Sequence, residues 1–121
     1  MHTLTSTVAR IIFAVPFAIF GLFHFMNASA MAGMVPIPGG VFWIYLTGAA
    51  LIAASISILI KKEARLACLL LALLLAIFAL SIHLPGALGG DQASVSSMLK
   101  DLALAGAALG FAGRFANDPT F

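Results

Sequence analysis

The stretch Ala64–Leu84, with the sequence ARLACLLLALLLAIFALSIHL, contains a single basic residue, Arg65, and no acidic residue. A helix rises about 1.5 Å per residue and the hydrocarbon core of a bilayer is about 30 Å thick, so about 20 apolar residues cross it. The stretch therefore predicts a transmembrane helix. Three stretches of the same kind cover about residues 8–26, 40–60 and 98–115.

These four segments account for most of a chain of 121 residues, of which 63% are hydrophobic and 8% charged, with a mean hydropathy of +1.16. Such a composition lies far from that of soluble domains. The segments lack the alternation of barrel strands, and a backbone in lipid must satisfy its own hydrogen bonds. We expect an all-α membrane protein: residues 1–121 form a single domain, an antiparallel bundle of four transmembrane helices.

The basic residues are sorted along the chain by the predicted side of the membrane. Five of the six are expected on one side: Arg10, Lys61, Lys62, Arg65 and Arg114. The positive-inside bias then places both termini in the cytoplasm, with the protein in the inner (plasma) membrane of the cell. Nucleic acid is not an expected partner, because the cations form no continuous basic face.

The first segment could also be read as a signal peptide, because Ala28-Ser29-Ala30 is similar to a cleavage site. Its apolar run is long for that role, so we expect it to remain as the first span. The next connection contains Pro36 and Pro38, which would stop a regular helix. Pro85-Gly86 is expected to end the third helix, and Ser96 or Ser97 to cap the fourth.

Helical periodicity places small residues on narrow stripes, where membrane helices can approach closely. Three stripes are predicted to face protein. They are Ala72, Ala76, Ala79 and His83 on the third helix; Asp101, Ala105, Ala108 and Ala112 on the fourth; and Gly106, Gly110 and Gly113, also on the fourth.

Three ionisable residues lie at the predicted outer ends of helix faces. His24 ends a face with Phe13, Phe17 and Phe20 on the first helix, His83 ends the alanine stripe of the third, and Asp101 begins that of the fourth. Ionisable groups inside membranes are expensive and commonly face a bundle interior or a cavity. A histidine beside an acid can exchange a proton with a redox carrier or hydrogen-bond a quinone carbonyl. The structural alternative is that these groups pin helix ends. No metal site or cofactor motif is recognisable.

Several motifs in order along the whole chain make it similar to the DoxX-like family of small membrane proteins. They are Arg10 followed by Phe17, Gly21 and His24; Pro36-Ile37-Pro38; Tyr45-Leu46-Thr47-Gly48; the basic turn; and Lys100-Asp101-Leu102-Ala103-Leu104 with Gly106. The resemblance implies a four-helix bundle that belongs to a membrane redox system, as in the DoxD-type subunit of thiosulfate:quinone oxidoreductase. It also implies Arg10, His24, Lys100 and Asp101 as ligand-binding positions, and the helical-face argument adds His83.

The chain departs from that family at two places. Leu51 and Ile52 stand where members often carry a glutamate, and Asp101 stands where asparagine is commoner. Asp101 retains an acceptor and can also carry charge.

The leading hypothesis is a redox-associated subunit that contacts a quinone or a partner oxidoreductase near the outer leaflet, and that is not a complete enzyme alone. Two alternatives stay open. One is a small-solute transporter that acts as a homo-oligomer. The other is a membrane anchor or assembly subunit without a small-molecule site.

Overall fold

The computed structural model describes residues 3–28 and 40–117, and all regular structure within these ranges is helical. The cleavage-like Ser29-Ala30 and the proline-containing connection lie outside the described residues. The elements are η1 (Leu4–Val8), α1 (Ala9–Met26), α3 (Gly40–Ile60), α4 (Ala64–Phe78), η2 (Ala79–His83), α5 (Leu84–Leu88) and α6 (Gln92–Asn117).

Consecutive elements join into four helical rods that are each long and apolar enough to cross a bilayer. These spans are Leu4–Met26, Gly40–Ile60, Ala64–Leu88 and Gln92–Asn117, with 23, 21, 25 and 26 residues. Large apolar side chains such as Ile12, Leu73 and Leu109 are exposed on them, as expected for surfaces that face lipid tails. The prediction of an all-α, multi-pass membrane protein is confirmed.

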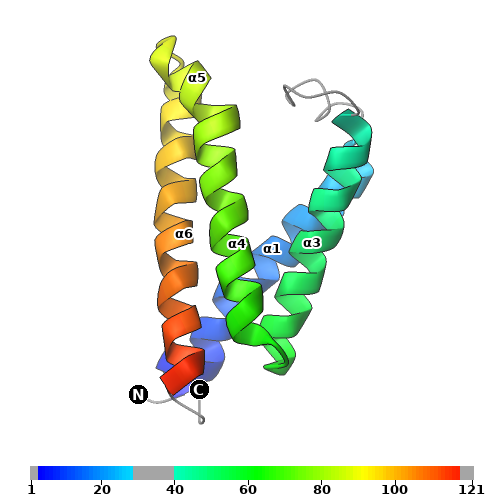
Figure 1. Cartoon of the computed structure of the whole chain (residues 1–121), viewed down its shortest axis with the longest axis vertical. Coiled ribbons are helices and arrows are strands. Elements are labelled where there is room, and N and C mark those ends of the chain that lie inside the picture. The colour runs from blue at the N-terminus through cyan, green and yellow to red at the C-terminus, as the bar shows by residue number, and fades with distance from the viewer. Residues whose placement is uncertain (1–2, 29–39, 118–121) are drawn as a thin grey trace.

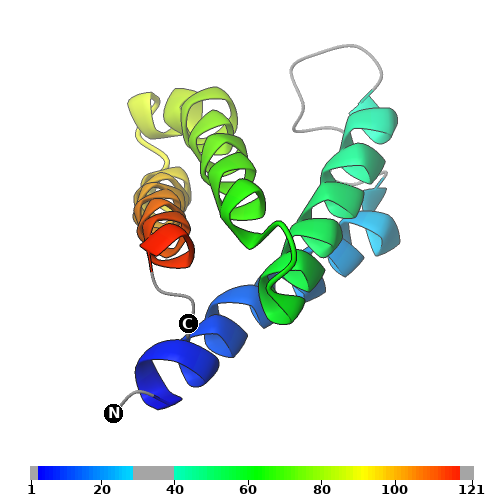
Figure 2. The same cartoon turned by 60° about the horizontal axis from the view of Figure 1, so that its bottom comes forward.

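The four spans pack as two pairs. Helix α1 lies along α3, α4 lies along α6, and α3 and α4 share a smaller contact. Figure 1 shows the two pairs close together at the end that carries the α3–α4 turn and spreading apart toward the other end, and Figure 2 shows the same separation from a second direction. The shared core lies where the pairs converge, and there Phe13 of α1 stacks on Phe111 of α6 with ring centroids 4.5 Å apart.

Glycine allows close approach within the α1–α3 pair. A Cβ atom added at Gly21 would lie 2.8 Å from the carbonyl oxygen of Gly48, and one added at Gly48 would lie 2.8 Å from Cβ of His24. Further along the interface, the buried Ser55 hydroxyl donates to the carbonyl of Ala14 over 2.7 Å. Small residues and a side-chain hydrogen bond therefore hold this pair, as is common between membrane helices.

The third span does not end at Pro85, as the sequence predicted, but continues to Leu88. Proline cannot donate a backbone hydrogen bond, and its ring crowds the carbonyl four residues earlier. Here Pro85 lies in the first turn of α5, directly after the π-helical turn η2. A π-turn is wider than an α-turn, so it accommodates the proline without ending the rod.

Helix α6 begins six residues earlier than expected because Asp91, and not a serine, caps it. The carboxylate of Asp91 accepts from the backbone N–H of Ala93 over 3.2 Å and from the Ser94 hydroxyl over 2.7 Å. Just before it, Gly90 has a φ of +89° and the Asp91 N–H donates to the Gly86 carbonyl over 3.0 Å. This pattern is a Schellman-type helix end followed at once by a new N-cap, so α5 turns directly into α6.

The predicted stripes have different outcomes. The buried residues of α6 are Asp101, Ala105, Ala108 and Ala112, as expected. The glycine stripe contacts no other helix of this chain, because a Cβ atom added at Gly106, Gly110 or Gly113 meets no atom within 4 Å. The alanine stripe already fills the contact with α4, which leaves the glycines turned away from it.

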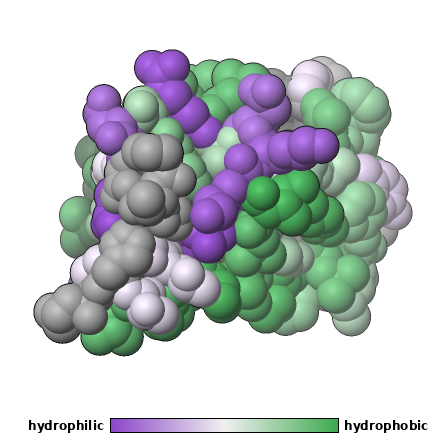
Figure 3. Space-filling view, turned by 90° about the horizontal axis from the view of Figure 1, so that it is seen from below, coloured by the Kyte–Doolittle hydropathy of each residue, from purple (hydrophilic) through white to green (hydrophobic). Residues whose placement is uncertain are grey.

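The end at which the pairs converge is polar. Figure 3 shows hydrophilic residues gathered on this face, with apolar residues around them. The Arg10 guanidinium donates to the carbonyl of Leu59 over 2.9 Å, and Arg114 donates to the carbonyl of Thr5 over 2.6 Å. Two of the basic residues thus tie helix ends together.

Candidate functional site

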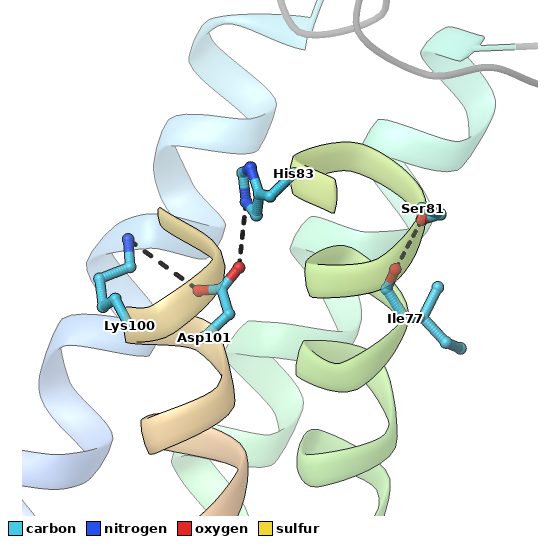
Figure 4. A network of polar contacts seen from close by, with 5 residues as sticks. All are labelled: Ile77, Ser81, His83, Lys100 and Asp101. Carbon is cyan, nitrogen blue, oxygen red and sulfur yellow. Dashed lines mark hydrogen bonds and ion pairs between the residues drawn. The ribbon is translucent and has the colours of Figure 1, made fainter. Parts of the chain in front are cut away.

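An ion pair between two spans lies near the end at which the pairs diverge. The Nε2 atom of His83 is 3.0 Å from Oδ2 of Asp101, and Nζ of Lys100 is 4.0 Å from Oδ1. Figure 4 shows His83 and Lys100 reaching the carboxylate from different sides. The structure thus brings together three of the five residues that the sequence singled out.

The π-turn η2 carries His83 at its last position. Within it the Ser81 hydroxyl donates to the Ile77 carbonyl over 2.6 Å, on the face of the helix away from Asp101. Single π-turns inside longer helices often occur at functional sites, because they change the direction of the side chains that follow. Here the turn presents His83 to α6.

The three side chains differ in exposure. The Asp101 side chain is 7% exposed, that of His83 is 20% exposed, and that of Lys100 is 64% exposed. The carboxylate is therefore a buried acceptor between two nitrogen groups, one of which remains largely outside. A histidine beside a carboxylate is a pair that can exchange a proton, and here Nε2 and Oδ2 are 3.0 Å apart.

Asp101 lies farther from the start of its helix than the sequence predicted. It was expected near the start of its helix, but α6 begins at Gln92. At 1.5 Å per residue, Asp101 is roughly 14 Å from that end and roughly 24 Å from Asn117. An ionisable residue within a candidate membrane span is a functional candidate.

The carboxylate opens onto a groove of about 660 Å³, which we call the α1–α6 groove. Lys100 and Asp101 are the charged residues of its lining, and the remainder is apolar, with several aromatic rings. The apolar lining includes Phe13, Pro16, Phe17, Phe20, Leu104 and Phe111. An apolar groove of this size with a few convergent polar groups is typical of sites for small molecules.

His24 lies on α1, and neither His24 nor His83 belongs to the lining of the α1–α6 groove. It is buried, its Nδ1 is 2.8 Å from the Phe20 carbonyl, and its ring packs edge-on against the Phe20 ring at 4.7 Å. Because a carbonyl only accepts, Nδ1 carries the hydrogen. His24 thus braces the α1–α3 contact beside Gly48.

Arg10 lies at the opposite end of the molecule from the ion pair. It is buried and donates to the carbonyls of Ile58 and Leu59, in the last turn of α3. The final carbonyls of a helix have no partner within it, and cations near that end are favourable. The contacts of Arg10 thus connect α1 to the end of α3.

Sequence reasoning missed the part of the groove that α6 contributes. The aromatic face of Phe13, Phe17 and Phe20 was visible from periodicity, but nothing in the sequence indicated that Leu104 and Phe111 would lie across from it. Within the described residues, no group of three or more histidine, cysteine or acidic side chains could hold a metal ion. Comparison with protein-family models, curated proteins and solved structures gives no match in any of the three.

Proposed function

We propose that this chain is a DoxX-like membrane subunit of a redox system that binds a quinone in the α1–α6 groove. The observation that carries the proposal is the groove itself, which has a volume of about 660 Å³, is lined mainly by apolar and aromatic residues and includes Asp101, the partner of His83. A quinone has the matching chemistry, with a flat ring bearing two carbonyl acceptors and an apolar tail.

The residues divide the work by their chemistry. Phe17 and Phe20 offer aromatic surface for the ring, and Leu104 and Phe111 offer apolar surface for the tail. Lys100 can donate to a carbonyl oxygen, because its ammonium group is exposed beside Asp101. The His83–Asp101 pair can hand over or accept the proton that accompanies electron transfer.

A bound quinone supplies two-electron, two-proton redox chemistry. The chain carries no recognisable motif for a resident electron carrier, so in this proposal a partner oxidoreductase exchanges the electrons. The proposed subunit holds the quinone and manages its protons. We further propose that the converging, basic end faces the cytoplasm of the inner membrane, which puts the ion pair toward the outer leaflet.

The first test is quinone affinity. Purified protein in lipid nanodiscs is titrated with a benzoquinone that carries a ten-carbon tail. Asp101→Asn keeps the size of the side chain and removes its charge, and Leu104→Trp fills the groove. Each should weaken binding by at least tenfold, whereas Asp91→Asn, a matched acid at the cap of α6, should not. Equal affinity in all four proteins would refute the site.

The second test separates the two histidines by nuclear magnetic resonance of labelled imidazoles, assigned with His24→Gln and His83→Gln. Quinone should shift the His83 resonances, because Nε2 of His83 lies 3.0 Å from Asp101, which lines the groove, and the shift should disappear in Asp101→Asn. The His24 ring packs against the Phe20 ring of that lining, so any shift of the His24 resonances should persist in Asp101→Asn whenever quinone is bound. A response confined to His24, or none, would count against the proposal.

The position of Asp101 favours a second candidate, a proton-coupled transporter for a small solute. Such transporters use an acid within the membrane, and Asp101 lies in the interior of α6. Proteoliposomes with an imposed proton gradient would then accumulate solute, and Asp101→Asn would abolish uptake. Quinone binding without any gradient-driven uptake would reject this alternative.

The exposed glycines of α6 favour a third candidate, an anchor or assembly subunit that packs against another membrane protein through Gly106 and Gly110. It predicts that Gly106→Leu releases a co-purifying partner, while Asp101→Asn does not. A partner that is lost only with Asp101→Asn would contradict it.

A further inference from the structure

A second apolar groove runs between α3 and α4, and it shares no lining residue with the α1–α6 groove. Its volume is about 440 Å³, and we call it the α3–α4 groove. Small side chains, mostly alanine, form the α3 side, and mostly larger aliphatic side chains form the α4 side. The lining includes Ala50, Ala53, Ala54, Leu66, Leu70 and Leu73. The small α3 side chains leave room for a thin, flexible apolar chain.

The groove reaches the α3–α4 turn, where Glu63 belongs to its lining. The turn carries Lys61 and Lys62, and Arg65 follows in the first turn of α4; all three are exposed. Within residues 3–28 and 40–117, none of these three cations takes part in an ion pair. Glu63 is the charged residue of the groove lining, and the three cations that flank it along the chain give the turn beside the groove a net positive charge.

The geometry of the turn adds backbone donors at the same place. Lys61 and Glu63 adopt positive φ angles of 61° and 53°, which let the chain reverse within three residues. The Glu63 side chain makes no capping hydrogen bond to α4, so the first N–H groups of that helix lack a side-chain acceptor at the cap. The N-terminus of a helix favours anions through these groups and through the helix dipole.

We propose that the α3–α4 groove binds an anionic phospholipid, with its phosphate at Lys61, Lys62 and Arg65 and one acyl chain along Ala53 and Leu70. The charge of the turn selects the headgroup, and the apolar walls select the tail. Basic pockets between helices at a membrane surface commonly bind acidic headgroups, and each cation raises the affinity about fivefold. Phosphatidylglycerol fits best, because its hydroxyls can donate to Glu63.

The test measures lipid that stays bound to the detergent-purified full chain, by native mass spectrometry, after exposure to phosphatidylglycerol or to phosphatidylcholine with the same acyl chains. The wild type should retain phosphatidylglycerol at least tenfold better. The triple variant Lys61→Gln, Lys62→Gln, Arg65→Gln should lose the preference. Equal retention by the wild type, or a preference that survives in the triple variant, would overturn the proposal.

Two matched pairs of variants test binding of the headgroup and binding of the acyl chain separately. Lys62→Gln should reduce the preference by about fivefold, and Lys100→Gln, a lysine at the other end, should not. Ala53→Phe should fill the groove and reduce retention of both lipids, while Ala107→Phe on the exposed face of α6 should not. If Ala53→Phe retains lipid as well as the wild type, the headgroup is held by charge at the surface and the acyl chain does not occupy the groove. Glycerol phosphate that competes as well as the lipid would mean a free-anion site, and either result rejects the proposal.

Discussion

Replacing Gly48 with alanine should push α1 and α3 apart. The added Cβ would lie 2.8 Å from Cβ of His24 and 2.9 Å from the carbonyl oxygen of Gly21. Carbon atoms in well-packed proteins approach to about 3.5–4.0 Å, so the contact is short by roughly 0.7 Å. Overpacking of this kind costs about 1–3 kcal/mol. Against it, alanine gains about 0.8–1.0 kcal/mol of helix propensity over glycine.

The matched control is Gly110→Ala, which has the same propensity gain and no atom within 4 Å of the added Cβ. Reversible unfolding in mixed detergent micelles, followed by circular dichroism, gives the free energy of each protein. Gly110→Ala should be as stable as the wild type or more stable, and Gly48→Ala should fall about 1–3 kcal/mol below Gly110→Ala. Equal free energies for the two variants would refute the close approach of α1 and α3.

Three further substitutions test individual contacts. Ser55→Ala removes the hydroxyl that donates to Ala14, and unfolding in mixed micelles should become about 0.5–1.5 kcal/mol easier. Arg10→Gln should lower stability by about 1–3 kcal/mol and leave quinone affinity unchanged in the nanodisc titration, because its contacts are with the end of α3. Asp91→Ala should lower the free energy of unfolding by about 1 kcal/mol and speed amide hydrogen exchange in the first turns of α6. Unchanged exchange would mean that another residue caps this helix.

Periodicity and composition were enough to predict the fold class, because both depend on local sequence. The burial of Ala105 and Ala108 followed from helical spacing alone. The start of α6 did not follow, since residues 92–97 are too polar to extend an apolar window and the cap is made by Asp91. The continuation of the third span past Pro85 depends on a π-turn, which no apolar pattern reveals.

The candidate site was predictable only in part. His83 and Asp101 were both expected at the outer ends of small-residue stripes, and the structure brings the two side chains together. His24 looked equivalent to His83 by its position near the end of a helix. In the structure, the close approach of α1 and α3 at Gly21 and Gly48 packs the His24 face of α1 against α3. The α1–α6 groove depends on how the two pairs of helices diverge, which is set by contacts far apart in sequence such as Phe13 with Phe111. A single sequence carries no direct record of such crossings.

Photolabelling tests the central claim most directly. A quinone with a photoreactive group on its ring is activated in membranes that contain the full chain, and labelled peptides are identified by mass spectrometry with and without excess unlabelled quinone. We predict displaceable labels on α1 around Phe17 and on α6 around Leu104, and their loss in Asp101→Asn. Labels that excess quinone does not displace, or labels confined to α3, would contradict the account.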